Sequence, residues 1–307
     1  MGTAKVVLEK LDGLDAPKVL AVVDAFPGKR QGLDAVLRGE KKIILEDTVP
    51  LLFDKNGRCI PHKLAVSAAV CDPNRGCRFN QFNFGLFNGD CLLPDWQKYF
   101  GQTPIYGSEL LSRILAIRAK VFDDPTVANL LSGPWFPILL PGIQLGEGGY
   151  GALLENFILP AAAKGHTEAF PERQFINHRQ GQLANQVGIV DERHKKLVAD
   201  LTRGPIPGIL CFPFQGFSVY AQRQMAYLLP DYMSLAGPIE IGVAEALYPA
   251  HLSRDNNTPG KDCSAVEWQD SGHSLYFKIT EVDLEFAFRA HLGDACDSNS
   301  GALFLRG

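Results

Sequence analysis

The stretch Ser274-Leu-Tyr-Phe-Lys-Ile-Thr-Glu-Val-Asp-Leu-Glu-Phe-Ala-Phe-Arg289 alternates apolar and polar residues over most of its length. Such a period of two is typical of half-buried β-strands. The apolar residues stand at odd positions up to Ile279 and at even positions from Val282 onward. Because neither Gly nor Pro marks the change of parity, we expect a β-bulge at this point rather than a hairpin turn.

Upstream of this stretch, the apolar residues recur at the spacing of helices. One amphipathic helix is predicted from about residue 108 to Asp123, where Asp-Pro ends it, and a short helix capped by Asp124 is expected to follow. The apolar positions of the first are Leu110, Ile114, Ile117 and Val121. The spacing also predicts a helix over 152–164, kinked at Pro160 and ended by Gly165.

The longest helical pattern covers 182–203 and closes at Gly204-Pro205. His194 lies within its apolar stripe, and we interpret it as a core histidine with one or two hydrogen bonds. After this helix, 209–214 predicts a buried strand and 218–229 another helix, broken at Pro230.

The first part of the chain reads as strands. Short ones are predicted at 6–9, 18–23, 42–45 and 51–53. Residues 78–87 predict a stronger strand. Asn88-Gly89 is a dipeptide typical of tight turns, so we expect a hairpin that leads into a second strand at 91–93.

These elements predict an α+β fold with a strand-rich N-terminal part, a helical middle and C-terminal antiparallel strands. The chain could form two domains, residues 1–150 and 151–307. A single large domain fits the length of 307 residues equally well. The segment Leu92-Leu-Pro-Asp-Trp96 is similar to Leu228-Leu-Pro-Asp-Tyr232. This similarity would fit an internal duplication, in which regions 50–150 and 185–290 are related halves. We favour coincidence, because apolar-Pro-Asp segments are common at helix starts.

Composition excludes several classes of protein. Hydrophobic residues make up 46% of the chain and charged residues 21%, which excludes a disordered protein. The formal net charge is −4, which argues against binding to nucleic acid or to a membrane surface. Residues 251–307 hold nine acidic and five basic residues and so carry the whole imbalance. We interpret this segment as a solvated acidic face.

The sequence also bears on location. We see no signal peptide and no apolar run long enough to span a membrane. The seven scattered cysteines do not form a disulfide framework. We therefore expect a soluble, cytoplasmic protein.

Residues 208–220 follow a strand–turn–helix pattern that could present a nucleophile. Ser218 is one candidate nucleophile, and Cys211 is the other. A serine or thiol needs an imidazole beside it for activation. The candidate bases are His166, His251 and His273. This pattern predicts hydrolase-like chemistry on a small molecule.

Two other motifs have weaker functional interpretations. Gly146-Glu-Gly-Gly-Tyr-Gly151 matches a phosphate-binding pattern, but Glu147 stands where a phosphate would lie, so we interpret it as a turn. His166 and Glu168 could contribute to a two-histidine, one-carboxylate iron site only if they lie on a strand. No metal site is predicted, and the residues do not identify a cofactor.

The segment 78–90 supports a second class of function. Phenylalanines alternate there with asparagine and glutamine, and aromatic faces with amide groups can bind polar ligands. The candidate ligand-binding residues are Phe79, Asn83, Phe87 and Trp96. A buried sheet would also explain the phenylalanines. The sequence thus supports either a small-molecule enzyme or a non-catalytic protein that binds a ligand or assembles through this segment.

Overall fold

The computed structural model describes residues 50–80, 82–102, 105–281 and 283–307, together with Gln31, Asp34, Ala35, Arg38 and Glu40. The chain divides into two units, residues 1–49 and 50–307. In the first unit, residues 31, 34 and 35 are helical, and Arg38 forms an ion pair with Glu40 at 2.7 Å. The strands predicted at 6–9, 18–23 and 42–45 lie outside the described residues. The remainder of this subsection concerns residues 50–307.

A four-stranded antiparallel sheet runs in the order β1-β4-β11-β5. Its strands are β1 (Trp135–Leu140), β4 (Ile206–Cys211), β11 (Leu303–Arg306) and β5 (Met233–Leu235). Strand β4 corresponds to the strand predicted at 209–214. Pro137 lies in β1, which is an edge strand of this sheet. Proline has no backbone N–H to donate to a neighbouring strand, and edge strands tolerate it.

A second sheet has five strands in the order β10-β6-β8-β9-β2. Its strands are β10 (Asn299–Gly301), β6 (Gly260–Asp262), β8 (Ser274–Thr280), β9 (Asp283–Arg289) and β2 (Phe175–Asn177). A two-stranded sheet pairs β3 (Val187–Ile189) with β7 (Val266–Trp268). With strands in both halves of the chain and helices between them, the fold is α+β, as predicted.

The connection between β8 and β9 is a hairpin, so the β-bulge predicted there is wrong. Thr280 pairs with Asp283, and Glu281 takes a φ of +38° without being glycine. Paired residues of antiparallel strands share a face. Ile279 pairs with Leu284, an odd position with an even one, so the two-residue connection itself requires the change of parity.

The helices are α4 (Gly89–Phe100), α5 (Gly107–Asp123), α6 (Gly149–Leu153), α7 (Leu159–Ala169), α8 (Glu192–Leu201), α9 (Val219–Ala226), α10 (Pro238–Leu247) and α11 (Pro249–Leu252). Short 3₁₀ turns occur at Phe84–Leu86 and Leu130–Ser132, and a π-helical turn at Leu154–Ile158 joins α6 to α7. Helix α5 confirms the predicted amphipathic helix, because all four of its predicted apolar positions are buried.

Two predicted elements differ from the structure for the same physical reason, helix capping. Asn88 does not turn a hairpin. Its side chain accepts a hydrogen bond from the backbone N–H of Asp90 and caps α4, so 91–93 is helical. Asp191 caps α8 in the same way, and the predicted helix 182–203 therefore begins only at Glu192. Residues 187–189 of that prediction form β3 instead.

The two similar segments have different secondary structure. Leu92–Trp96 lies inside α4, whereas 228–232 is a turn between α9 and β5. The duplication that their similarity would fit therefore has no structural counterpart at these two segments.

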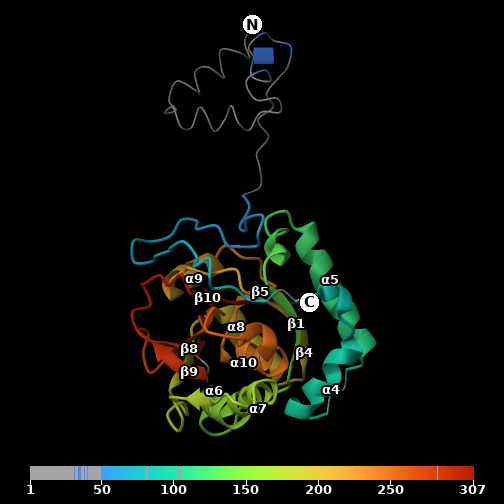
Figure 1. The fold of residues 1–307 in the computed structure, drawn as a ribbon, viewed down its shortest axis with the longest axis vertical. Coiled ribbons are helices and arrows are strands. Elements are labelled where there is room, and N and C mark those ends of the chain that lie inside the picture. The colour runs from blue at the N-terminus through green and yellow to red at the C-terminus, as the bar shows by residue number, and fades with distance from the viewer. Residues whose placement is uncertain are drawn as a thin grey trace. The chain divides into compact units, whose positions relative to one another are not determined.

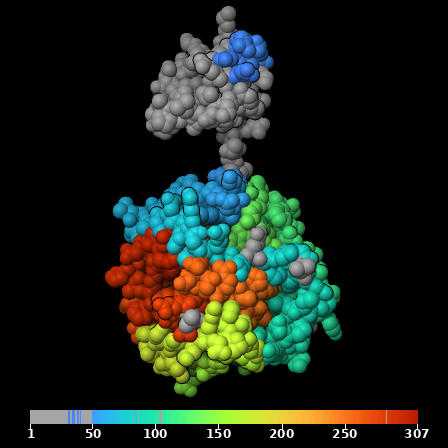
Figure 2. Space-filling view, viewed as in Figure 1, coloured from blue at the N-terminus to red at the C-terminus, as the bar shows by residue number. Residues whose placement is uncertain are grey.

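Helix α10 lies at the centre of this unit and is buried along almost its whole length (Figure 1). It contacts β1 and β4 on one side, while Gly242 approaches Phe277 of β8 on the other. Helix α5 contacts β4 as well, and the four-stranded sheet stands between α5 and α10 (Figure 1). In the space-filling view, the C-terminal residues (orange and red) lie between the 50–80 segment (blue to cyan) and the α6–α7 segment (yellow to green) (Figure 2).

Two glutamates of α10 are completely buried, and each has a partner from another element. Glu240 lies 2.9 Å from Nδ1 of His194 in α8, whose Nε2 lies 3.1 Å from the Tyr150 hydroxyl. Glu245 lies 2.7 Å from Nζ of Lys261 in β6, and it also accepts a hydrogen bond from Ser253. All four side chains of these two contacts are fully buried. The interpretation of His194 as a core histidine with partners is thus confirmed.

Gly165 does not end α7, because the helix continues to Ala169. A Cβ atom at residue 165 would lie 2.3 Å from the carbonyl oxygen of Ala246 in α10. Only glycine lets the two helices approach this closely. Gly165, which was predicted to end the helix, instead allows α7 to pack closely against α10.

We expect Gly165→Ala to lower the free energy of unfolding by about 1–3 kcal/mol, since the new methyl group forces α7 away from α10. Alanine has the higher helix propensity, so a gain of stability would show that the close approach does not matter. Thr167→Ala, at an exposed position of the same helix, is the matched control. Urea unfolding of the three proteins measures the difference.

Removing one member of the Glu245–Lys261 pair should be more harmful than removing both. Lys261→Met leaves a buried carboxylate without its cation, and we expect a loss of about 3–5 kcal/mol. The double variant Glu245→Leu/Lys261→Met removes both charges and should lie closer to the parent protein. Equal or additive losses in urea unfolding would contradict the pairing.

Candidate functional site

The two predicted nucleophiles are both buried. Ser218 caps α9, and its Oγ accepts hydrogen bonds from the backbone N–H groups of Ala221 and Ala69, each at 3.1 Å. Cys211 ends β4, and burial raises the pKa of its thiol well above the ordinary value. No hydrogen bond joins either side chain to a histidine in the part of the chain that is described. The predicted nucleophile–histidine arrangement is thus not formed in this structure.

The three predicted bases lie on separate elements. His166 is fully buried in α7, and neither ring nitrogen has a hydrogen-bond partner among the described residues. Burial lowers the pKa of its imidazole. His273 precedes β8, and its Nδ1 lies 2.7 Å from a carboxylate oxygen of Asp270. His251 lies in α11. The structure does not bring these histidines together.

The other two motifs have structural roles. Gly148, with a φ of +84°, precedes the five-residue helix α6, and a Cβ on Gly151 would lie 1.8 Å from the carbonyl oxygen of Leu183. The glycine-rich segment is therefore a turn that leads into α6, and Gly151 packs tightly against the 183–184 backbone. His166 and Glu168 lie on helix α7 rather than on a strand, and Glu168 pairs at the surface with Lys98. Over the described ranges, no three His, Cys, Asp or Glu side chains gather as metal ligands.

The predicted aromatic-amide residues divide into two pairs. Phe79 is buried and packs on Phe212, with the ring centroids 4.4 Å apart. Trp96 is buried, and its indole N–H donates to the carbonyl of Leu139 at 2.6 Å. These two side chains belong to the core.

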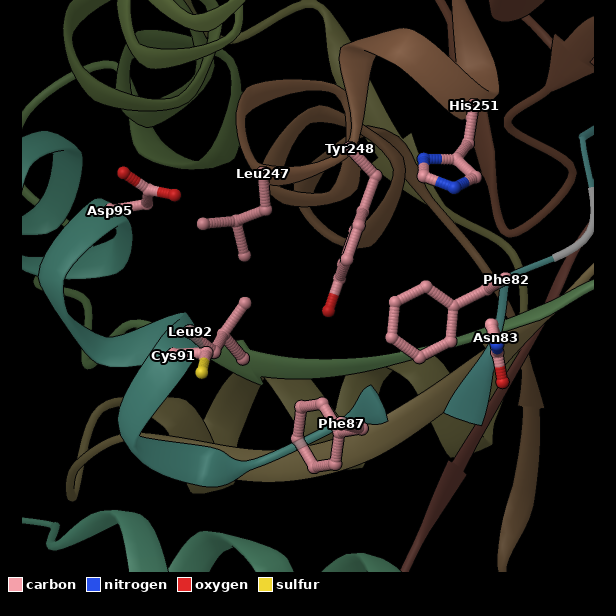
Figure 3. A pocket seen from close by; sticks show the side chains of 9 residues that line it. All are labelled: Phe82, Asn83, Phe87, Cys91, Leu92, Asp95, Leu247, Tyr248 and His251. Atoms are coloured by element: carbon pink, nitrogen blue, oxygen red, sulfur yellow. The ribbon is translucent and has the colours of Figure 1, made fainter. Parts of the chain in front are cut away.

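Asn83 and Phe87, in contrast, line a pocket of about 290 Å³. The pocket lies between α4, the segment around the first 3₁₀ turn, and the junction of α10 with α11 (Figure 3). Its lining residues are Phe82, Asn83, Phe87, Cys91, Leu92, Asp95, Leu247, Tyr248 and His251. His251, which was predicted as a catalytic base, thus belongs to the same cavity as two predicted ligand-binding residues.

Aromatic rings form much of the wall. Phe82 contacts Phe87, Tyr248 and His251 with ring-centroid distances of 6.2, 5.4 and 6.0 Å. The Tyr248 hydroxyl is not free, because it donates to the carbonyl of Pro137 in β1 at 2.6 Å. Tyr248 therefore offers the pocket its ring.

The polar groups of the pocket are few. Burial lowers the pKa of His251, so its imidazole is neutral at pH 7, and no side-chain hydrogen bond joins it to any described residue. The Asn83 side-chain oxygen accepts from the N–H of Gly85. Asp95 is exposed and lies on the opposite side of the view from His251 (Figure 3). An imidazole with no hydrogen-bond partner among the described residues, in a largely apolar cavity, is suited to bind a ligand.

Sequence reasoning missed Cys91, Leu92, Asp95, Leu247 and Tyr248 as residues of the site. Cys91 and Asp95 are four residues apart, and this spacing places two side chains on one face of a helix. Because residues 91–93 were predicted as a strand, the spacing of Cys91 and Asp95 did not indicate that they share a face. Of the seven cysteines, all in the described part of the chain, only Cys91 is exposed.

The comparisons with known proteins found no matching family model, no matching curated protein and no matching solved structure. Among the described residues, none of the helices is both long enough and apolar enough to cross a membrane. The case for function therefore rests on the pocket's own geometry.

We expect iodoacetamide to alkylate Cys91 well before Cys211 in the native protein. Cys91 is exposed, whereas burial both blocks access to Cys211 and keeps its thiol protonated. Mass mapping of the modified residues at increasing times measures the order. Labelling of Cys211 as fast as Cys91 would revive Cys211 as an activated nucleophile.

Proposed function

We propose that this protein binds a small organic molecule in the pocket lined by Phe82, Phe87, Tyr248 and His251. The observation that carries the proposal is an aromatic cavity containing an imidazole with no hydrogen-bond partner among the described side chains. Its volume of about 290 Å³ lies just below the usual range for ligand pockets, roughly 300–1,000 Å³. The ligand is accordingly a small molecule rather than a peptide.

The geometry favours this function over hydrolysis at 208–220. Ser218 already accepts two backbone hydrogen bonds and is fully buried, so it has a structural role as a helix cap. Hydrolytic chemistry there stays a prediction that no described contact supports. The pocket, in contrast, combines groups from segments far apart in the sequence, as binding sites commonly do.

The walls of the pocket are held in place by core contacts. Leu92 is buried in α4, and Tyr248 is tied to β1 through Pro137. Phe82 packs on Phe136 of β1, with the ring centroids 6.0 Å apart. A pocket whose walls are fixed before binding loses little conformational entropy when a ligand enters.

A fragment screen tests the proposal, with binding followed by ligand-observed NMR. Cys91→Trp fills the mouth of the pocket from an exposed position, and Gln97→Trp adds the same side chain at an exposed position of α4 outside it. We expect fragments to bind the parent protein and Gln97→Trp alike. Binding to Cys91→Trp should be at least about tenfold weaker.

Alkylation of Cys91 gives an independent measurement on the parent protein. A fragment bound in the pocket should slow the reaction of this thiol with iodoacetamide. The proposal fails if no fragment both slows alkylation and loses affinity for Cys91→Trp.

A further inference from the structure

We infer that the ligand of this pocket is an organic cation, an ammonium group joined to a small apolar or aryl body. This inference rests on the proposed function and adds the chemical class of the ligand. It is drawn from the charges that line the pocket, from its aromatic rings and from a cation that the protein already holds against the same group of rings.

The first argument is charge. Asp95 is the only acidic residue among the nine that line the pocket, and none of the nine is Lys or Arg. The imidazole of His251 is neutral at pH 7, because burial lowers its pKa. The lining therefore has one negative charge and no positive charge to balance it. An anionic ligand would be repelled, and a cationic one attracted.

The second argument is the aromatic lining of the cavity. The face of an aromatic ring carries negative electrostatic potential and attracts cations. Phe82, Phe87 and Tyr248 line the cavity, and the Tyr248 hydroxyl is bonded to Pro137. These rings present π-surface together with little competing hydrogen-bonding capacity. Such a surface suits an ammonium group or the methylene groups next to it.

The third argument comes from the protein itself. The guanidinium carbon of Arg118 lies 4.1 Å from the ring centroid of Phe84 and 5.4 Å from that of Trp135. Phe84 in turn stacks on Phe87, with the ring centroids 5.4 Å apart. The aromatic cluster therefore already binds one cation of the chain, and Phe87 extends this cluster to the pocket.

The arrangement also sets the orientation of the ligand. Asp95 and Cys91 lie on the α4 side, and Phe82 and His251 lie across the cavity (Figure 3). A molecule that reaches both sides places its ammonium group near Asp95 and its apolar body against Phe82 and Tyr248. The neutral imidazole of His251 is then available to a hydrogen-bonding group at the far end.

Three probes with one aryl body test the inference: 2-phenylethylamine, 2-phenylethanol and phenylacetate, which carry charges of about +1, 0 and −1 at pH 7. Their affinities are measured by calorimetry on the full chain, with protection of Cys91 from iodoacetamide as the second readout. We expect the amine to bind most tightly and the carboxylate most weakly.

Asp95→Asn removes the negative charge at an exposed position, so the fold should be unaffected. Because Asp95 is exposed to solvent, its ion pair is screened, and we expect the amine to lose about two- to fivefold in affinity. The alcohol should bind the variant as it binds the parent protein. Asp123→Asn, the same change at an exposed position of α5, is the control and should leave all three affinities unchanged.

The outcomes separate this inference from the proposed function. If the alcohol or the carboxylate binds as tightly as the amine, or if Asp95→Asn leaves their ratio unchanged, the ligand is not selected for positive charge and the inference is wrong. The same holds if no probe binds while other fragments still protect Cys91, and the pocket then stands as a binding site. If no fragment protects Cys91 at all, both proposals fall.

Discussion

A helix with two carboxylates inside a hydrophobic core is the constraint on which this structure depends. Moving a charge from water into the interior costs several kcal/mol unless a partner compensates for the loss of hydration. Helix α10 meets this requirement at both of its buried glutamates, through His194 of α8 and Lys261 of β6. Each pair connects α10 to a different part of the unit, so the helix is held in position along its axis as well as against its neighbours.

The end of α10 positions one wall of the pocket. Leu247 is the last residue of α10, and Tyr248 and His251 follow directly after it. The Tyr248 hydroxyl reaches the carbonyl of Pro137, which holds this end of the helix against β1. The same backbone that buries the Glu245–Lys261 pair thus directs an aromatic ring and an imidazole into the cavity. Core and site are consecutive parts of a single segment.

Sequence patterns predicted the elements that are governed by burial on one face. The four apolar positions of α5 and the alternation in β8 and β9 follow directly from the periods of helices and strands. Capping residues were harder to interpret, because Asn favours both tight turns and helix N-termini. Asn88 was read as a turn, although Leu92, Trp96 and Phe100 follow it at helical spacing and are buried. Only the tertiary contacts of these side chains distinguish the two alternatives.

The sequence predicted some residues of the candidate site but not that they lie together. Asn83, Phe87 and His251 were each named from sequence, but for two different functions, because no local pattern links residues so far apart in the chain. Phe79 and Trp96 resemble Phe87 in type, yet they are buried in the core. Which aromatic residues face a cavity depends on how α4 packs against the end of α10. That information is tertiary and is absent from any short stretch of sequence.

Strand β11 has a consequence for how the protein is made. It occupies an interior position in its sheet, between β4 and β5, although it is the last strand of the sheet to leave the ribosome. Until residues 303–306 emerge, β4 and β5 each have an edge that lacks its partner strand, and such edges pair readily with other chains. This sheet therefore cannot close until residues 303–306 have been made, after all of its other strands.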